Sequence, residues 1–139
     1  MRNARTERTG WRDAALSDWH GYWGLDCPAV DLDFVLVEYD HAQVMALVEY
    51  KHESAAPQRP SHPSYRALAD LGSRATIPVF AVRYAGDFSW WRVTPLNLAA
   101  HLYVKEPTRL NEREWVRLLY RIRGRTLPVG LFATAEAPA

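Results

Sequence analysis

Two strand-like runs separated by only three residues constrain this chain more than any other feature of its sequence. Residues 31–39 read DLDFVLVEY and residues 43–51 read QVMALVEYK, and both are rich in β-branched and aromatic side chains. Asp40, His41 and Ala42 between them form a short turn. The two runs are therefore predicted to pair as an antiparallel β-hairpin.

The rest of the chain alternates between helical and strand-like patterns. Apolar residues at three-to-four spacing predict helices over 11–23, 64–73 and 111–122. Strands are predicted over 77–84, whose nearly continuous apolar run is typical of a strand buried on both faces, and over 88–93. Helices interleaved with strands indicate an α/β or α+β sheet covered by helices.

Size and composition indicate one small globular domain. The 139 residues, 48% hydrophobic and 24% charged, fit a single domain over 1–139, with a core over about 11–125 and poorly ordered ends at 1–9 and 126–139. A net charge of +1 means that nucleic-acid binding would need a local patch. The single cysteine, Cys27, excludes an internal disulfide. The chain shows no membrane-length apolar run and no secretory signal, so we expect a cytoplasmic protein without a membrane partner. Its compact size is typical of phage or bacterial proteins.

Acidic side chains occupy defined positions on the hairpin. Side chains alternate between the faces of a strand, so Asp31 and Asp33 share a face, as do Glu49 and Lys51. A turn centred on His41 sets Asp33 opposite Glu49. The same register sets Asp31 opposite Lys51. Directly opposed side chains have Cβ atoms about 4.5–5.5 Å apart, so two carboxylates and a lysine are predicted to lie close together.

The opposed carboxylates predict a metal site. Like charges directly opposite each other destabilise a sheet, and a hard cation such as Mg²⁺ or Mn²⁺ between Asp33 and Glu49 would relieve the repulsion. Lys51 would stabilise negative charge or position a water, and these are the usual components of phosphodiester hydrolysis. Asp31 is the alternative metal ligand to Asp33. A different interpretation stays open, in which Asp31 and Lys51 form a cross-strand ion pair and the other two carboxylates are solvated.

These residues resemble the PD-(D/E)XK nuclease superfamily, which includes restriction endonucleases and Holliday junction resolvases. Asp33 followed by Glu49, Tyr50 and Lys51 matches its Asp…Glu-x-Lys signature, and the order of elements agrees over roughly residues 11–84. The resemblance implies a restriction-endonuclease-like α/β fold with a mixed sheet flanked by helices. It further implies Mg²⁺ or Mn²⁺ held by Asp33 and Glu49, catalysis assisted by Lys51, and DNA as the substrate, and it leaves a homodimer open.

Two features of that superfamily are not settled by the sequence. Many members add an acidic residue from the first helix, and the chain leaves little room for the strand that usually precedes the acidic strand. The alternative hypothesis is therefore a non-catalytic nucleic-acid- or protein-binding module that keeps the nuclease fold. A third is a structural protein whose hairpin charges form surface ion pairs. The candidates for the first-helix position are Glu7, Asp13, Asp18 and His20.

Parity also predicts which neighbours point away from this site. Glu38 falls on the opposite face from Asp33, and His52 falls on the opposite face from Lys51. We therefore expect neither Glu38 nor His52 to face the carboxylate pair.

Arginines form a stripe on the helix predicted over 111–122. Arg113, Arg117 and Arg121 recur every four residues beside its apolar face. The spacing predicts either a phosphate-binding stripe that positions DNA or a solvated helix face. Only two lysines occur in the chain, Lys51 and Lys105, and its other basic residues apart from histidine are arginines. Lys51 is therefore an unusual choice of cation for this sequence.

Overall fold

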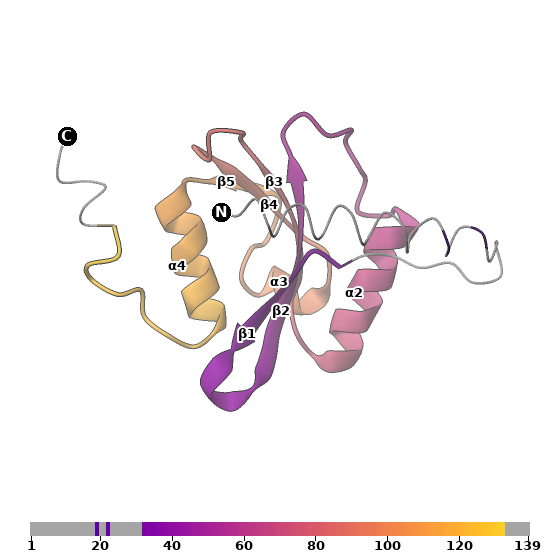
Figure 1. Ribbon diagram of the computed structural model, residues 1–139. Coiled ribbons are helices and arrows are strands. Elements are labelled where there is room, and N and C mark those ends of the chain that lie inside the picture. The colour runs from indigo at the N-terminus through magenta and orange to yellow at the C-terminus, as the bar shows by residue number, and fades with distance from the viewer. Residues whose placement is uncertain (1–18, 20–21, 23–31, 133–139) are drawn as a thin grey trace. The chain divides into compact units, whose positions relative to one another are not determined.

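The computed structural model of the chain describes Trp19, Tyr22 and residues 32–132 (Figure 1). The chain divides into two compact units, Met1–Asp31 and Leu32–Ala139, and the fold below is that of the second. Of the helix predicted over 11–23, Trp19 and Tyr22 are described and both are helical. Its other residues lie outside the described part, and a single domain over 1–139 stays a prediction.

The second unit is an α/β structure built on a five-stranded mixed sheet. In spatial order the strands are β1 (Phe34–Glu38), β2 (Gln43–His52), β3 (Val79–Tyr84), β4 (Trp91–Pro95) and β5 (Thr108–Leu110). β2 and β3 are parallel, and the other neighbouring strands are antiparallel. The described α-helices are α2 (Pro63–Ala75), α3 (Leu98–His101) and α4 (Glu112–Ile122). The predicted α/β class, with a sheet flanked by helices, is confirmed.

The hairpin of β1 and β2 has the predicted register at its open end. Phe34 lies opposite Val48, and Leu36 lies opposite Ala46. The register shifts after Leu36, nearer the turn, where Tyr39–His41 form a 3₁₀ helix. At the turn Glu38 pairs with Gln43, one residue off the register predicted from a turn centred on His41, and the irregularity after Leu36 restores the predicted register toward Asp33.

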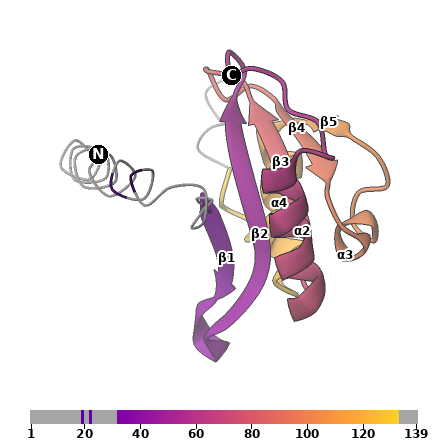
Figure 2. The same ribbon diagram turned by 90° about the vertical axis from the view of Figure 1, so that its right-hand side faces the viewer.

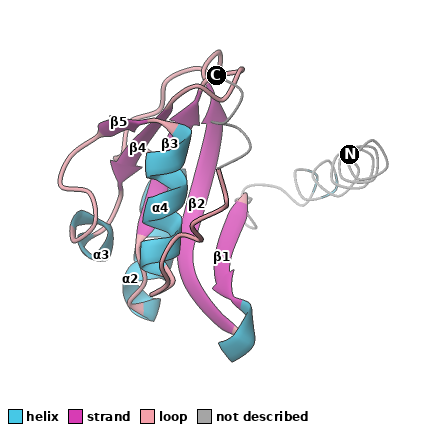
Figure 3. Cartoon of the chain, turned by 90° about the vertical axis from the view of Figure 1, so that its left-hand side faces the viewer, coloured by secondary structure: helices cyan, strands magenta, loops and turns pink. Residues whose placement is uncertain are grey.

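Helices α2 and α4 cover opposite faces of the sheet (Figures 2 and 3). On the α4 face, Trp115 packs into the larger apolar cluster together with Val48 and Phe80. On the α2 face, a smaller cluster joins Leu47, Leu68 and Val79. Successive residues of β2 thus enter the two clusters alternately, as a strand requires. Glu49 and Lys51 follow Leu47 on the α2 face.

Two of the later strands differ from expectation. The predicted strand over 88–93 begins only at Trp91, because the chain turns at Phe88, whose φ is 62°. The backbone N–H of Ser89 donates to Oδ1 of Asp87 at 3.0 Å, which stabilises this turn. β5 was not predicted, since three residues carry no readable period.

The helix predicted over 111–122 is confirmed as α4. The Asn111 side chain accepts from the backbone of Glu114, whose side chain accepts in turn from the Asn111 backbone, so a capping box begins the helix. No helix in the described part of the chain is long and apolar enough to cross a membrane.

Candidate functional site

Asp33 and Glu49 meet at the open end of the hairpin. The backbone N–H of Asp33 donates to Oε1 of Glu49 at 3.3 Å, and the backbone N–H of Tyr50 donates to Oδ2 of Asp33 at 3.0 Å. Each carboxylate is therefore held by the backbone of the opposite strand. The predicted pairing of these two side chains is confirmed, and their chemical roles stay predictions.

Tyr50 determines which way its neighbours on β2 point. Its ring lies on the α4 face in edge contact with Phe34, Trp91 and Trp115, and its hydroxyl accepts from Nε1 of Trp115 at 3.2 Å. Burial in this aromatic cluster raises the pKa of Tyr50. Because Tyr50 is fixed on the α4 face, Glu49 on one side of it must project toward the α2 face, and so must Lys51 on the other.

A cavity of about 280 Å³ opens beside Lys51 on the α2 face. Its floor comes from β2, β3 and β4, and its walls include Pro57 and Pro60 of the loop after β2. Ala81, which lies opposite Glu49 on β3, also lines it. The cavity thus lies toward the carboxyl ends of the parallel strands β2 and β3, where ligands bind in open α/β sheets.

Tyr65 of α2 lines the same cavity and was not predicted as a site residue. Burial and the negative charges of Glu49 and Asp33 raise its pKa, against the opposing effect of Arg83. The protonated hydroxyl can donate a hydrogen bond at this cavity. In the sequence Tyr65 looks like a core residue of an amphipathic helix, and nothing there marks it as polar-facing.

Arg83 on β3 shapes the cavity wall. Its Nη1 donates to the backbone oxygens of His52 at 3.2 Å, Glu53 at 2.9 Å and Ala55 at 2.8 Å. These bonds hold the start of the loop against β3, beside Lys51, the residue opposite Arg83 in the sheet. Sequence reasoning missed Arg83 because its partners are about thirty residues away along the chain.

The donor set fits Mg²⁺ or Mn²⁺. Among residues 32–132, Trp19 and Tyr22 there is no group of three or more His, Cys, Asp or Glu side chains that could hold a metal ion. The candidate ligands in this part of the chain are therefore the two carboxylates of Asp33 and Glu49. Magnesium is commonly bound by one or two carboxylates, with water and substrate phosphate in its other positions. The backbone bonds involve Oε1 of Glu49 and Oδ2 of Asp33. The remaining predicted ligands lie outside the described residues: Glu7, Asp13, Asp18, His20 and Asp31.

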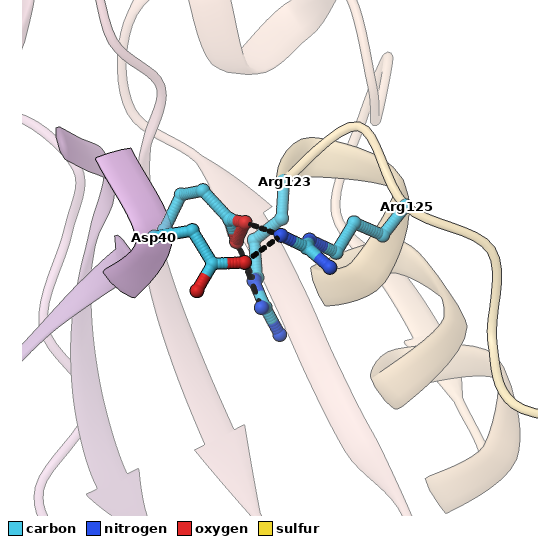
Figure 4. Close-up of polar contacts among 4 residues, drawn as sticks. Asp40, Arg123 and Arg125 are labelled. Atoms are coloured by element: carbon cyan, nitrogen blue, oxygen red, sulfur yellow. Dashed lines mark hydrogen bonds and ion pairs between the residues drawn. The ribbon is translucent and has the colours of Figure 1, made fainter. Parts of the chain in front are cut away.

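The closed end of the hairpin carries a second acidic pair, and arginines bind it (Figure 4). Nη2 of Arg123 lies 2.8 Å from Oε1 of Glu38, while Arg125 contacts Glu38 and lies 2.7 Å from Oδ2 of Asp40. Arg125 and Arg123 hold the pKa of Glu38 below its ordinary value of 4.5. Both arginines follow α4, so Glu38 faces away from Asp33, as predicted.

His52 also points away from the carboxylate pair, as predicted. Its ring lies against Tyr84 at a centroid distance of 5.5 Å, and its Nδ1 lies 2.8 Å from Oγ of Ser54. This places the imidazole on the aromatic side of the sheet. His52 therefore has no place in the site formed by Asp33 and Glu49.

The arginine stripe lies on α4, across the sheet from the carboxylates. Arg113 stacks on Phe132 at 5.6 Å, and Arg121 stacks on Tyr103 at 5.1 Å. Arg113, Arg117 and Arg121 line a cavity of about 360 Å³ between α4 and the segment that follows it. The stripe and the carboxylate pair thus lie on opposite faces, and DNA binding by the stripe stays a prediction.

Comparison of the chain with protein-family models, with curated proteins and with solved structures finds no match.

Proposed function

We propose that this protein is a metal-dependent nuclease that hydrolyses phosphodiester bonds in DNA, on a restriction-endonuclease-like fold. The observation that carries the proposal is the carboxylate pair of Asp33 and Glu49, interlocked across the hairpin, with Lys51 next on the same face at the edge of a cavity. Carboxylates that can hold a cation, and a lysine beside a cavity, are the components that phosphodiester hydrolysis requires.

Asp33 and Glu49 would hold Mg²⁺ or Mn²⁺, which when bound supplies charge stabilisation at the phosphate and a more acidic water. The backbone bonds to the two carboxylates fix their positions before any ligand arrives, so little reorganisation is needed on binding. Lys51 would donate to a phosphate oxygen, where negative charge develops in the transition state.

Tyr65 would add a second, neutral donor from the opposite wall of the cavity. Its raised pKa keeps the hydroxyl protonated beside two negative charges. A protonated phenol in this position orients a phosphate oxygen or a water without adding charge.

The test is incubation of purified protein with supercoiled plasmid in Mg²⁺, in Mn²⁺ and in EDTA. We expect nicking or linearisation in both metals and none in EDTA. Lys51→Ala should lower the cleavage rate by roughly 10²–10³-fold, as for loss of one transition-state donor. Lys105→Ala is the matched control, because Lys105 is exposed and is the only other lysine in the chain.

Equal cleavage by wild type and Lys51→Ala would contradict the assignment of Lys51, and cleavage that persists in EDTA would contradict the metal requirement. If the plasmid is not cut, the same comparison on branched and flapped DNA decides whether the substrate or the activity was wrong.

A non-catalytic binding module with the same fold is the second candidate. It is favoured by the backbone hydrogen bonds to both carboxylates, which give them a structural role in the hairpin. Titration of the wild-type protein with Mn²⁺ separates the two candidates. Binding that Glu49→Gln abolishes supports the nuclease, and the absence of binding supports the module.

A further inference from the structure

A row of cationic side chains crosses the sheet beside the candidate site. Lys51 on β2 lies opposite Arg83 on β3, Arg83 lies opposite Arg92 on β4, and Arg92 lies opposite Arg109 on β5. Directly opposed residues share a face, so all four belong to the α2 face, the face that carries Glu49. We call these four residues the cationic row.

The cationic row is an unusual arrangement for a sheet. Like charges directly opposite each other are destabilising, yet four stand abreast. In residues 32–132 no ion pair to an acidic side chain involves any of the four. Arg83 is satisfied by backbone oxygens, and Arg109 stacks on Trp90 at 4.5 Å, which positions these charges without neutralising them. The row therefore favours an anionic ligand.

The row has the shape of a track for one polyanionic chain. Adjacent strands lie about 4.8 Å apart, so the four positions extend in a single line over roughly 14 Å. The line begins at Lys51, next to the carboxylates, and runs toward β5 at the edge of the sheet. A single small anion would occupy only part of it.

The cavity selects a single strand over a duplex. Lys51, Arg83 and Arg92 all line the 280 Å³ cavity, which Pro57 and Tyr65 help to wall. This volume lies just under the roughly 300–1,000 Å³ of ordinary small-ligand pockets, so it holds about one nucleotide. A duplex is too wide to enter such a space and reach the same three cations.

We propose that the cationic row binds successive phosphates of a single nucleic-acid strand, with one nucleotide in the cavity and the adjoining phosphate at Asp33 and Glu49. This inference rests on the proposed nuclease function and specifies its substrate as a strand end, flap or other single-stranded region. The strand crosses the sheet on the α2 face, and the arginine stripe of α4 lies on the other face, outside its path.

The test is binding of a short fluorescently labelled single strand in EDTA, measured by anisotropy over a range of salt concentrations. Each phosphate contact on a single strand contributes about 0.7 to the slope of log K against log salt. Arg92→Gln and Arg109→Gln should therefore each reduce the slope by about 0.7 and weaken binding about five-fold at ~0.1 M salt. Both side chains are exposed, and thermal unfolding checks that the variants fold.

Two other variants serve as comparisons. Arg74→Gln removes one charge from the far end of α2, where Arg74 is paired with Asp70, and should leave binding unchanged. Arg117→Gln removes one charge from the α4 stripe and should also leave it unchanged. A duplex of the same length should bind more weakly than the single strand.

Three results would overturn the proposal: no binding by wild type at low salt, an effect of Arg117→Gln but not of Arg92→Gln, or a duplex bound as tightly as the single strand. Because the measurement contains no metal, it is independent of cleavage. If binding depends on Arg92 but the protein cuts no nucleic acid, the proposed nuclease activity is wrong and the proposed binding by the cationic row is still supported.

Discussion

The two ends of the β1–β2 hairpin each bring two acidic side chains together, and they stabilise them in different ways. At the closed end, Arg123 and Arg125 contact Glu38 and Asp40 directly and balance their charge. At the open end, backbone amides donate to the carboxylates: that of Tyr50 to Asp33, and that of Asp33 to Glu49. Amides hold a carboxylate through hydrogen bonds alone, whereas the guanidinium groups at the closed end also carry a formal charge.

This difference shows why an acidic pair alone does not indicate a metal site. Glu38 lies in β1 and Asp40 in the turn after it, whereas Asp33 immediately precedes β1 and Glu49 lies in β2. The closed end already has its cations from the protein, so a divalent ion there would compete with two guanidinium groups. At the open end Lys51 lies two residues beyond Glu49 on the same strand and lines the cavity. The following changes test this distinction.

The largest expected effect follows from Glu49→Gln. Gln keeps an oxygen that can accept from the Asp33 backbone but loses the charge that a cation requires, so cleavage should fall by about 10³-fold. Glu38→Gln, the same chemical change at the closed end, should leave cleavage unchanged at a temperature where the protein is folded. Initial rates of plasmid cleavage measure both. Equal losses for the two variants would erase the distinction between the ends.

A smaller effect is expected from Tyr50→Phe, which tests the hydrogen bond between Tyr50 and Trp115 on the α4 face of the open end. Removing the hydroxyl leaves Nε1 of the buried Trp115 without its acceptor, which should lower the free energy of unfolding by about 1–3 kcal/mol. Urea unfolding measures this value. Tyr39→Phe is the control because Tyr39 lies in the exposed turn, and an equal loss there would refute the anchoring role of the Tyr50–Trp115 bond.

Divalent metal should stabilise the folded protein through the open end only. With free Mn²⁺ at ten times its dissociation constant, the stabilisation is about 1.4 kcal/mol, which raises the melting temperature of wild type. Asp33→Asn should lose this increase, and Asp40→Asn at the closed end should keep it. Differential scanning fluorimetry with and without Mn²⁺ makes the comparison. If Asp33→Asn is still stabilised by Mn²⁺, the ion binds at another site and the assignment to Asp33 is wrong.

The smallest effect is expected from pH at the closed end. Arg125 and Arg123 lower the pKa of Glu38 in the folded state, so the ionised form stabilises the protein above the ordinary value of 4.5. That stabilisation is lost as the pH falls through the folded pKa. Wild type should therefore melt above Glu38→Gln at pH 7, and the gap should close under pH 4.5. A gap that stays constant with pH would contradict the ion-pair explanation.

Local patterns predicted most of the elements and failed where chain geometry overrode them. The hairpin follows from two β-branched and aromatic runs joined by a short turn, β3 from a nearly continuous apolar run, and α2 and α4 from three-to-four spacing. β4 begins later than its apolar run because Phe88 adopts a left-handed conformation and the chain turns there. β5 is too short to show a period and exists because it pairs with β4.

The sequence by itself determined the meeting of Asp33 and Glu49 and the common face of Glu49 and Lys51. Alternation along a strand is a local property of the backbone, so the common face needs no distant residue, and a short turn leaves few registers. The meeting of Asp33 and Glu49 also depends on the irregularity after Leu36, which makes up the one-residue offset at the turn.

Only the tertiary structure decided what surrounds that pair. The parallel pairing of β2 with β3 sets Arg83 beside Lys51 across a loop and a helix, and the next strands add Arg92 and Arg109. Packing also placed α4 and its arginine stripe on the other face, and it brought Arg125 to Glu38. These contacts join residues that are far apart along the chain. The burial of apolar area on both faces of the sheet brings those residues together, and a local sequence pattern does not encode it.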